Sequence, residues 1–238
     1  YEFDRVYKLH QMRVWNYNVM FEPVLGFGPK DVTVEYSIDG AEWTVLGDVE
    51  LAQASGQADY MANTAVDFQG VAAQFVRITI NSNRGGRSQY GLSEVRFLQI
   101  PVLARQPQPA SNATDVDVDS VLAWRSGREA VTHEVYMGTD PNALSLLDSA
   151  DQAGYDPGEL KLGTTYYWQI DEANEAETIS TWTGDLWSFA TQEFLVVDDF
   201  ESYTDDEGSR IYEIWADGWV NDTGSTVGYF EAPFAEQT

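Results

Sequence analysis

The sequence contains no cysteine, only two histidines, and 13 basic residues against 39 acidic ones. Without cysteine the chain has no disulfide, no thiolate nucleophile and no cysteine-ligated zinc, so apolar burial must hold its fold together. The formal net charge of −26 opposes binding to a phosphate backbone, because such binding requires clustered Lys and Arg. We therefore expect no nucleic-acid partner.

Long apolar runs are missing as well. No stretch approaches the ~20 residues that a membrane-spanning helix needs. The chain also opens without the charged and apolar regions of an export signal. We expect no membrane insertion, and we expect any export signal to lie upstream of Tyr1.

Catalytic motifs are scarce. His10 and His133 lie in strand-like stretches, away from any Gly-x-Ser-x-Gly setting, and are interpreted as surface histidines. Gly85-Gly86 lacks the strand-to-helix context of a phosphate-binding loop. Paired carboxylates can hydrolyse glycosides, but 39 acidic residues make any chosen pair arbitrary. The sequence predicts no catalysis within this chain; the alternative is an accessory region of a glycan-degrading enzyme whose catalytic domain lies outside it.

What the sequence does contain is alternation with a period of two. Apolar residues from Val32 to Ile38 are interleaved with polar ones, and Asp39-Gly40 then turns the chain toward Trp43, which is typical of a β-hairpin. No window of helical length shows a 3.6-residue period, and 13% of the residues are aromatic. These features predict an all-β chain of tandem β-sandwiches. Similar short runs recur at 76–80, 135–137, 166–170 and 187–189.

Composition divides the chain into four segments. Residues 101–112 contain three prolines, which favours a Pro-rich linker, and a further boundary is predicted near 191–193. Residues 1–100 carry 12 acidic and 8 basic residues, whereas residues 193–238 carry 12 and 1. The last segment is too short for a sandwich, and the first begins in mid-strand sequence. We therefore expect 1–100 to be truncated at its start and 193–238 at its end, around a domain at 113–192.

The first segment carries several features in a fixed order. Phe3–Val6 leads into Val14–Asn18, a strand with an Asp-Gly turn and a Trp follows at 32–43, and the strands 75–80 and 91–97 flank a Gly-rich loop. In this order the segment resembles a factor V/VIII type C, or discoidin, domain. The resemblance implies a galactose-binding-like jelly roll of the kind that serves as a carbohydrate-binding module.

The other two domains also resemble known modules. Residues 113–192 resemble a fibronectin type III domain, with Trp124 as the core tryptophan, 133–138 as the next strand and Tyr166 at the spacing of a tyrosine corner. Residues 193–238, opening on Val196–Tyr203, resemble the start of a laminin-G-like jelly roll.

The order of the three modules is similar to that of large secreted proteins of planctomycete-like bacteria. It implies an extracellular or cell-surface location. It also implies a role in adhesion, with the flanking domains of the same chain and a glycan or polysaccharide as partners.

The resemblance places ligands on loops at one end of the first sandwich. In the loop 81–90, arginine forks and side-chain amides offer donors and acceptors for sugar hydroxyls, and the Tyr90 ring offers a flat face for the sugar's C–H groups. The candidate ligand-binding residues are Asn18, Asn81, Arg84, Arg87, Gln89 and Tyr90.

Structural interpretations of the same residues stay open. Gly85-Gly86 can form a plain tight turn with solvated arginines beside it. Trp15 is interpreted as a core residue, with Asn16 and Asn18 as turn formers. Met20-Phe21 resembles the apolar spikes of lipid-binding discoidin domains, although the acidity of the chain opposes that function. A purely structural surface protein is therefore the alternative to a glycan-binding one.

Calcium is the only cofactor that the sequence suggests. In the resembled family a calcium ion is completed by the glutamate of the closing strand, here Glu94, but one carboxylate does not satisfy a cation that takes six to eight oxygens. Asp199 and Glu201, together with Asp198, offer a second set of oxygens in the last segment. None of these residues has the spacing of an EF-hand.

The glycan interpretation predicts that Arg84→Ala and Tyr90→Ala each abolish binding to an immobilised glycan, because they remove the donor fork and the stacking face. A glycan array probed with and without calcium, with the double variant as control, measures this. Unchanged binding by the variants would remove this loop as the site.

Overall fold

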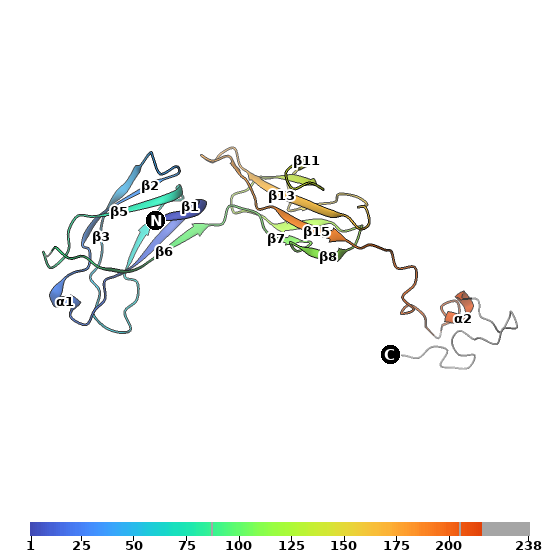
Figure 1. Ribbon diagram of the computed structural model, residues 1–238, viewed down its shortest axis with the longest axis horizontal. Coiled ribbons are helices and arrows are strands. Elements are labelled where there is room, and N and C mark those ends of the chain that lie inside the picture. Colours follow the sequence, from blue (N-terminus) through green and yellow to red (C-terminus); the bar gives the residue numbers. More distant parts are fainter. Residues whose placement is uncertain (87, 205, 216–238) are drawn as a thin grey trace. The chain divides into compact units, whose positions relative to one another are not determined.

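The computed structural model describes residues 1–86, 88–204 and 206–215 (Figure 1). The chain forms two compact units, Tyr1–Thr191 and Gln192–Thr238. The first unit holds two β-sandwiches, so the all-β prediction is confirmed. No helix among the described residues is long and apolar enough to cross a membrane.

The first sandwich is built around one unusually long strand. β1 pairs antiparallel with β5 at its beginning, where Glu2 lies opposite Phe75, and with both β4 and β6 farther on, where Val14 lies opposite Thr64 and Val95. The remaining sheet order is β3-β2-β5. The elements are β1 (Glu2–Asn16), α1 (Glu22–Leu25), β2 (Asp31–Ser37), β3 (Thr44–Glu50), β4 (Thr64–Asp67), β5 (Ala72–Ile80) and β6 (Leu92–Ile100).

Alternating apolar residues of these strands form the first core. Because side chains of a strand alternate between faces, Met12 and Val14 of β1 point inward together with Val32 and Val34 of β2. Trp15 therefore points to the opposite face, where the Arg96 guanidinium lies 4.7 Å from its ring centre. The interpretation of Trp15 as a core residue was wrong.

The second sandwich has the topology of a fibronectin type III domain. One sheet has the order β11-β10-β13-β15-β8, with β14 beside β13, and the other has the order β12-β9-β7. Trp124 of β9 packs edge-on against Trp168 of β13, and both belong to the second core. The strands are β7 (Arg105–Gln108), β8 (Ala113–Val116), β9 (Leu122–Arg125), β10 (Thr132–Gly138), β11 (Ser145–Ala150), β12 (Gly154–Tyr155), β13 (Thr165–Ala173), β14 (Thr181–Trp182) and β15 (Trp187–Thr191).

The tyrosine corner is present in this sandwich. The Lys161 backbone N–H donates to the Tyr166 hydroxyl at 3.0 Å. The Tyr166 ring stacks on Phe189 of β15, with ring centres 5.7 Å apart. The hydroxyl thus ties the loop that precedes β13 to the sheet.

The stretch expected to be a Pro-rich linker belongs to the second sandwich. β7 lies within residues 101–112 and pairs with β9, where Arg105 is opposite Arg125. Val102 and Ala104 are buried, and the Arg128 N–H donates to the Pro101 carbonyl. Proline is tolerated here because β7 is the edge strand of its sheet.

The two histidines have different environments. His10 is exposed, as predicted, but His133 is 4% exposed and its Nδ1 contacts the buried Glu172 carboxylate. A second oxygen of Glu172 accepts the Gly127 N–H at 2.6 Å. The interpretation of His133 as a surface residue was wrong, because it shares the inward face of β10 with Val135 and Met137.

The unit Gln192–Thr238 is described only up to Trp215. Its one regular element among the described residues is the short helix α2 (Ile211–Ile214), so the strand expected at Val196–Tyr203 is not formed. A strand needs a neighbouring strand for its backbone hydrogen bonds, and the described part of this unit offers none. The remainder of the expected jelly roll lies outside the described residues.

Tyr166→Phe is expected to lower the free energy of unfolding by about 0.5–1.5 kcal/mol, because it removes one hydrogen bond and leaves the ring in place. Urea denaturation followed by tryptophan fluorescence measures the change. Tyr167→Phe on the same strand is the matched control. Equal effects of the two substitutions would contradict the role of the corner.

Candidate ligand-binding loops of the first sandwich

Three loops meet at one end of the first sandwich. They are residues 17–30 between β1 and β2, 51–63 between β3 and β4, and 81–91 between β5 and β6. We call this end the loop platform. The predicted ligand residues Asn18, Asn81, Arg84, Arg87, Gln89 and Tyr90 all belong to it, although Arg87 lies outside the described residues.

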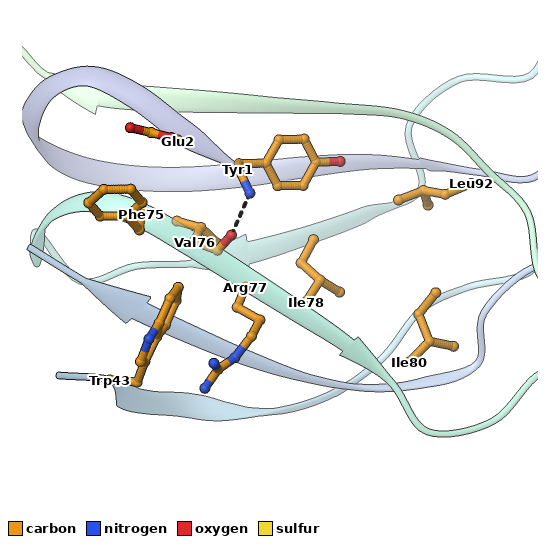
Figure 2. A pocket seen from close by; sticks show the side chains of 9 residues that line it. All are labelled: Tyr1, Glu2, Trp43, Phe75, Val76, Arg77, Ile78, Ile80 and Leu92. Atoms are coloured by element: carbon orange, nitrogen blue, oxygen red, sulfur yellow. Dashed lines mark hydrogen bonds between the residues drawn. The ribbon is translucent and has the colours of Figure 1, made fainter. Parts of the chain in front are cut away.

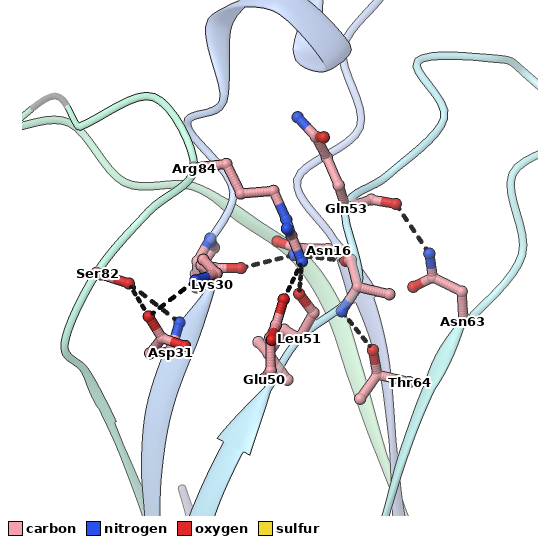
Figure 3. Close-up of polar contacts among 12 residues, drawn as sticks. Asn16, Lys30, Asp31, Glu50, Leu51, Gln53, Asn63, Thr64, Ser82 and Arg84 are labelled. Atoms are coloured by element: carbon pink, nitrogen blue, oxygen red, sulfur yellow. Dashed lines mark hydrogen bonds and ion pairs between the residues drawn. The ribbon is translucent and has the colours of Figure 1, made fainter.

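Asn16, the last residue of β1, joins two of the loops (Figure 3). Its side-chain nitrogen donates to the carbonyls of Pro29 at 2.8 Å and Ala52 at 2.9 Å. Its side-chain oxygen accepts the Tyr17 N–H at 2.8 Å. Asn16 is 1% exposed, so these bonds are made away from water. The Asn16 side chain therefore holds two loops together, rather than only forming a turn.

The Glu22 side chain also binds backbone groups, within the loop 17–30. Its carboxylate is fully buried and accepts the backbone N–H groups of Phe27 at 3.1 Å and Gly28 at 2.8 Å. Its own carbonyl accepts a hydrogen bond from the Gln53 side chain at 2.9 Å. A buried carboxylate is tolerated only when such donors surround it.

Asn18 is engaged with the second loop. Its side-chain nitrogen donates to the Gln57 carbonyl and its side-chain oxygen accepts the Gly56 N–H, both at 2.7 Å. Its backbone N–H donates to the Ser93 hydroxyl at 3.1 Å. Both ends of the amide are therefore already occupied by the protein itself.

Arg84 also points into the scaffold rather than toward a ligand. Figure 3 shows its guanidinium between Glu50 and Leu51, where it donates to the Glu50 carboxylate at 3.0 Å and to the Leu51 carbonyl at 2.8 Å. The following residue, Gly85, donates its N–H to the Gly26 carbonyl at 2.9 Å. A Cβ at Gly85 would lie 2.1 Å from the Leu25 carbonyl oxygen. Gly85 and Gly26 thus allow two loops to touch.

The charge near Arg84 is balanced locally. The Ser82 hydroxyl donates to the Asp31 carboxylate at 2.5 Å, and the Lys30 ammonium lies 3.6 Å from the same carboxylate. The Ser82 hydrogen bond first, and the nearby Lys30 and Arg84 charges after it, hold the pKa of Asp31 below its ordinary value. At neutral pH this part of the platform therefore presents paired charges.

The remaining predicted residues differ in their availability. Asn81 donates to the Thr33 hydroxyl at 2.9 Å. Gln89 contributes its backbone carbonyl to the Asn83 side chain. Among the described contacts, none involves the side chain of Gln89 or the hydroxyl of Tyr90, and both residues are exposed. Of the predicted set, these two are the best placed for an outside ligand.

Of the large exposed apolar side chains of the platform, sequence reasoning assigned Tyr90 to glycan binding but not Met20, Phe21 or Val24. Met20 is 75% exposed, Phe21 63%, Val24 82% and Tyr90 46%. The first three lie in or beside α1, a helix of four residues that is too short to show a helical period. Exposed aromatic rings on a rigid support are the groups that cover the apolar faces of ligands. Their presence here adds Phe21 to the candidate site.

The predicted metal ligands Glu94 and Asp199, and their neighbour Asp198, contact groups of the protein itself. Glu94 contacts the Arg96 guanidinium, and Asp199 accepts the Glu201 N–H at 3.0 Å. Asp198 is held by the Tyr203 hydroxyl and the Trp215 indole N–H. In the part of the chain that the structure describes, no group of three or more His, Cys, Asp or Glu side chains is arranged to hold a metal ion.

No family model matches the chain, and no curated protein matches it. Solved structures are similar to parts of it. The crystal structure of FN3tt matches with 17% identity and a TM-score of 0.29, covering 39% of this chain and 98% of that one. A mutant of FN3tt matches with 15% identity and a TM-score of 0.28, covering 38% and 97%.

A third solved structure is the beta-1,2-glucanase from Parabacteroides distasonis, with 12% identity and a TM-score of 0.30. The match covers 82% of this chain but only 29% of the glucanase. This chain therefore corresponds to less than a third of that enzyme's length.

Asn16→Ala is expected to lower the free energy of unfolding by about 2–4 kcal/mol, because it leaves two carbonyls and one N–H of the loops without partners. Chemical denaturation measures the loss. Asn81→Ala, which removes an exposed amide with one hydrogen bond, is the control and should change stability by less than about 1 kcal/mol. A similar loss in the two variants would contradict the locking role of Asn16.

Proposed function

We propose that this chain is a non-catalytic carbohydrate-binding and adhesion region of an extracellular or cell-surface protein, and that the glycan binds at the loop platform. The observation that carries the proposal is the combination of a locked support with exposed rings. The platform is formed before any ligand arrives, because its loops are held together by the side chains of Asn16, Asn18, Glu22 and Arg84. Binding to such a surface costs little conformational entropy.

The exposed groups suit a sugar. A pyranose ring has an apolar C–H face that an aromatic ring can cover, and hydroxyl groups that amides and backbone groups can bind. Phe21 and Tyr90 supply rings, and Gln89 supplies an amide with both a donor and an acceptor. The charges of Arg84 and Asp31 are already paired, which favours a neutral glycan over an anionic one.

The discoidin-like character of the first sandwich belongs to this proposal. Its support is the jelly-roll-like arrangement in which β1 serves two groups of strands and all the candidate residues lie in loops at one end. The fibronectin-like sandwich would then act as a spacer that is joined to the first one by ion pairs. Lys8 contacts Glu129 at 2.5 Å and Glu177 at 2.7 Å, and its side chain is only 12% exposed.

A second candidate function is purely structural. The observation that favours it is the pairing of Arg84 with Glu50 and Leu51, because the Nη2 donors of the guanidinium are then used within the protein. In that case the two sandwiches would position neighbouring domains, including a glycan-degrading catalytic domain outside this chain, without binding a glycan.

Phe21→Ala and Tyr90→Ala are each expected to weaken glycan binding roughly tenfold, since burying a large apolar side chain contributes about 1.5–3 kcal/mol. Affinity electrophoresis against neutral polysaccharides, followed by calorimetry with the oligosaccharide that binds, measures the effect. Binding of a single sugar should be weak, in the millimolar range.

Phe194→Ala is the matched control, since it removes an exposed ring outside the platform. Its affinity should equal that of the unmodified chain. If the folded chain binds no glycan, or if the platform variants bind as tightly as the control, the structural function replaces the glycan-binding one.

A further inference from the structure

Two arginines face each other on the outer face of the first sandwich. Arg13 of β1 lies directly opposite Arg96 of β6, and both are exposed. Arg13 points outward because its neighbours Met12 and Val14 point into the core. Side chains placed directly opposite each other have Cβ atoms about 5 Å apart, and like charges at this spacing repel. The pair therefore concentrates positive charge on one face of an acidic chain.

Arg13 differs from the other cations of this sandwich. Its one described hydrogen bond runs from Nε to the Gln11 side-chain oxygen at 3.0 Å, and it forms no ion pair with a described carboxylate. By contrast, Arg77 makes two hydrogen bonds to Glu35, at 2.6 and 2.7 Å, and Figure 2 shows its side chain beside the Trp43 ring. Every other described basic residue of the first sandwich has a carboxylate oxygen within 4.0 Å: Arg5, Lys8, Lys30, Arg77, Arg84 and Arg96.

A groove of about 370 Å³ lies beside Arg13. Gln11, Arg13 and Trp15 of β1 line one wall, and residues 61–65 line the other. Trp15 is half-buried and Met61 is 70% exposed, so both offer apolar surface. We call this site the outer groove. Its volume lies within the range of small-ligand sites.

The side-chain nitrogens that stay unoccupied in the outer groove are donors. The Nη atoms of Arg13 and the side-chain nitrogen of Gln11 make no hydrogen bond to a described residue. The Asn63 amide is already bonded at both ends, at 2.9 and 2.7 Å, and the Thr64 hydroxyl accepts a backbone N–H at 2.9 Å. Such donors, together with a positive charge, suit an oxyanion.

The acidity of the chain leaves this positive charge in place. Two carboxylates lie on the same outer face, those of Asp67 and Glu94. Asp67 accepts a backbone N–H at 2.8 Å, and Glu94 contacts Arg96. At physiological ionic strength, charges more than about 8 Å away are largely screened. An anion in the outer groove therefore interacts mainly with Arg13.

We propose that the outer groove binds an acidic sugar unit, one that carries a carboxylate or a sulfate group. The Arg13 guanidinium binds two oxygens of the anionic group. The Trp15 ring, which lines the groove, covers the apolar face of the sugar. Arg96 lies 4.7 Å from the centre of that ring and adds to the positive charge.

An acidic peptide suits the outer groove less well than a glycan. A peptide strand binds through the backbone of an unpaired sheet edge, but β1 is paired here with both β4 and β6. The groove also shares none of the exposed groups proposed for neutral glycans, Phe21, Gln89 and Tyr90. It is therefore a second site with a different ligand, and it does not depend on the function of the loop platform.

The test uses two pairs of probes that differ in charge. One pair is the tetramer of galacturonic acid and its methyl ester, and the other is a galactan tetrasaccharide with and without sulfate esters. In calorimetry at least one acidic probe is expected to bind roughly tenfold more tightly than its uncharged counterpart, because charge-assisted hydrogen bonds are about twice as strong as neutral ones. Its affinity should fall with added salt. Equal binding within both pairs would overturn the proposal.

Arg13→Gln is expected to weaken binding of the acidic probe roughly tenfold, because it removes the hydrogen bonds from the charged fork. Arg125→Gln is the matched control. Arg125 is an exposed arginine of β9 whose side chain makes no described contact, so the substitution changes the net charge equally and should leave the affinity unchanged. Equal losses in the two variants would show a general charge effect and would contradict a site at Arg13.

Two further probes separate the glycan from other anions. Tetraglutamate and inorganic sulfate should each bind much more weakly than the acidic sugar, because neither has a ring for Trp15 to cover. Equally tight, Arg13-dependent binding of either one would assign the groove to acidic peptides or to simple anions and would overturn the proposal. In NMR spectra the acidic sugar should shift the Trp15 indole N–H and the amides of 61–65. Shifts confined to Phe21 and Tyr90 would contradict the second site.

Discussion

The first sandwich depends on a constraint placed on one strand, since β1 must pair with β5 at its beginning and with β4 and β6 at its end. β1 pairs with β5 up to Lys8, with β6 from Lys8 and with β4 from Gln11. Because β1 ends at Asn16, this path also fixes where the buried amide lies. The position of the loop platform therefore follows from the pairing of β1 with β4, β5 and β6.

The three loops are held together by side chains that bind backbone groups, beginning with Asn16. Asn16 ties the loop 17–30 to the loop 51–63, Asn18 ties the same pair a second time, and Arg84 brings in the loop 81–91. Loops held in this way lose little freedom when a ligand binds. The same bonds explain why most of the polar residues that look suited to a sugar are not free to bind one, and why the exposed rings matter more.

The strands could be predicted from sequence because their signal is local. The period-two pattern of β2 and the Asp-Gly turn after it lie within a dozen residues, and Tyr166 sits at a fixed spacing from Lys161. The partners of Asn16 lie 13 and 36 residues away, and His133 finds Glu172 at a distance of 39 residues. A local sequence pattern does not predict contacts between residues so far apart in the chain.

Two errors could have been avoided by applying the alternation strictly. Trp15 follows the inward-facing Val14 and so had to point outward, while His133 precedes Val135 and Met137 by even steps and so had to point inward. The proline-rich stretch at β7 was misjudged for a different reason. Proline excludes a central strand but not an edge strand, and the position of a strand within its sheet is not a local property of the sequence.

The most direct test of the account is an NMR titration of the chain with a neutral oligosaccharide that it binds, following every backbone amide. The account predicts that the shifts concentrate in the loop platform, around Phe21, Gln89 and Tyr90, while the strands and the second sandwich stay unchanged. Shifts concentrated elsewhere in the chain, or no shifts with any neutral glycan, would contradict it.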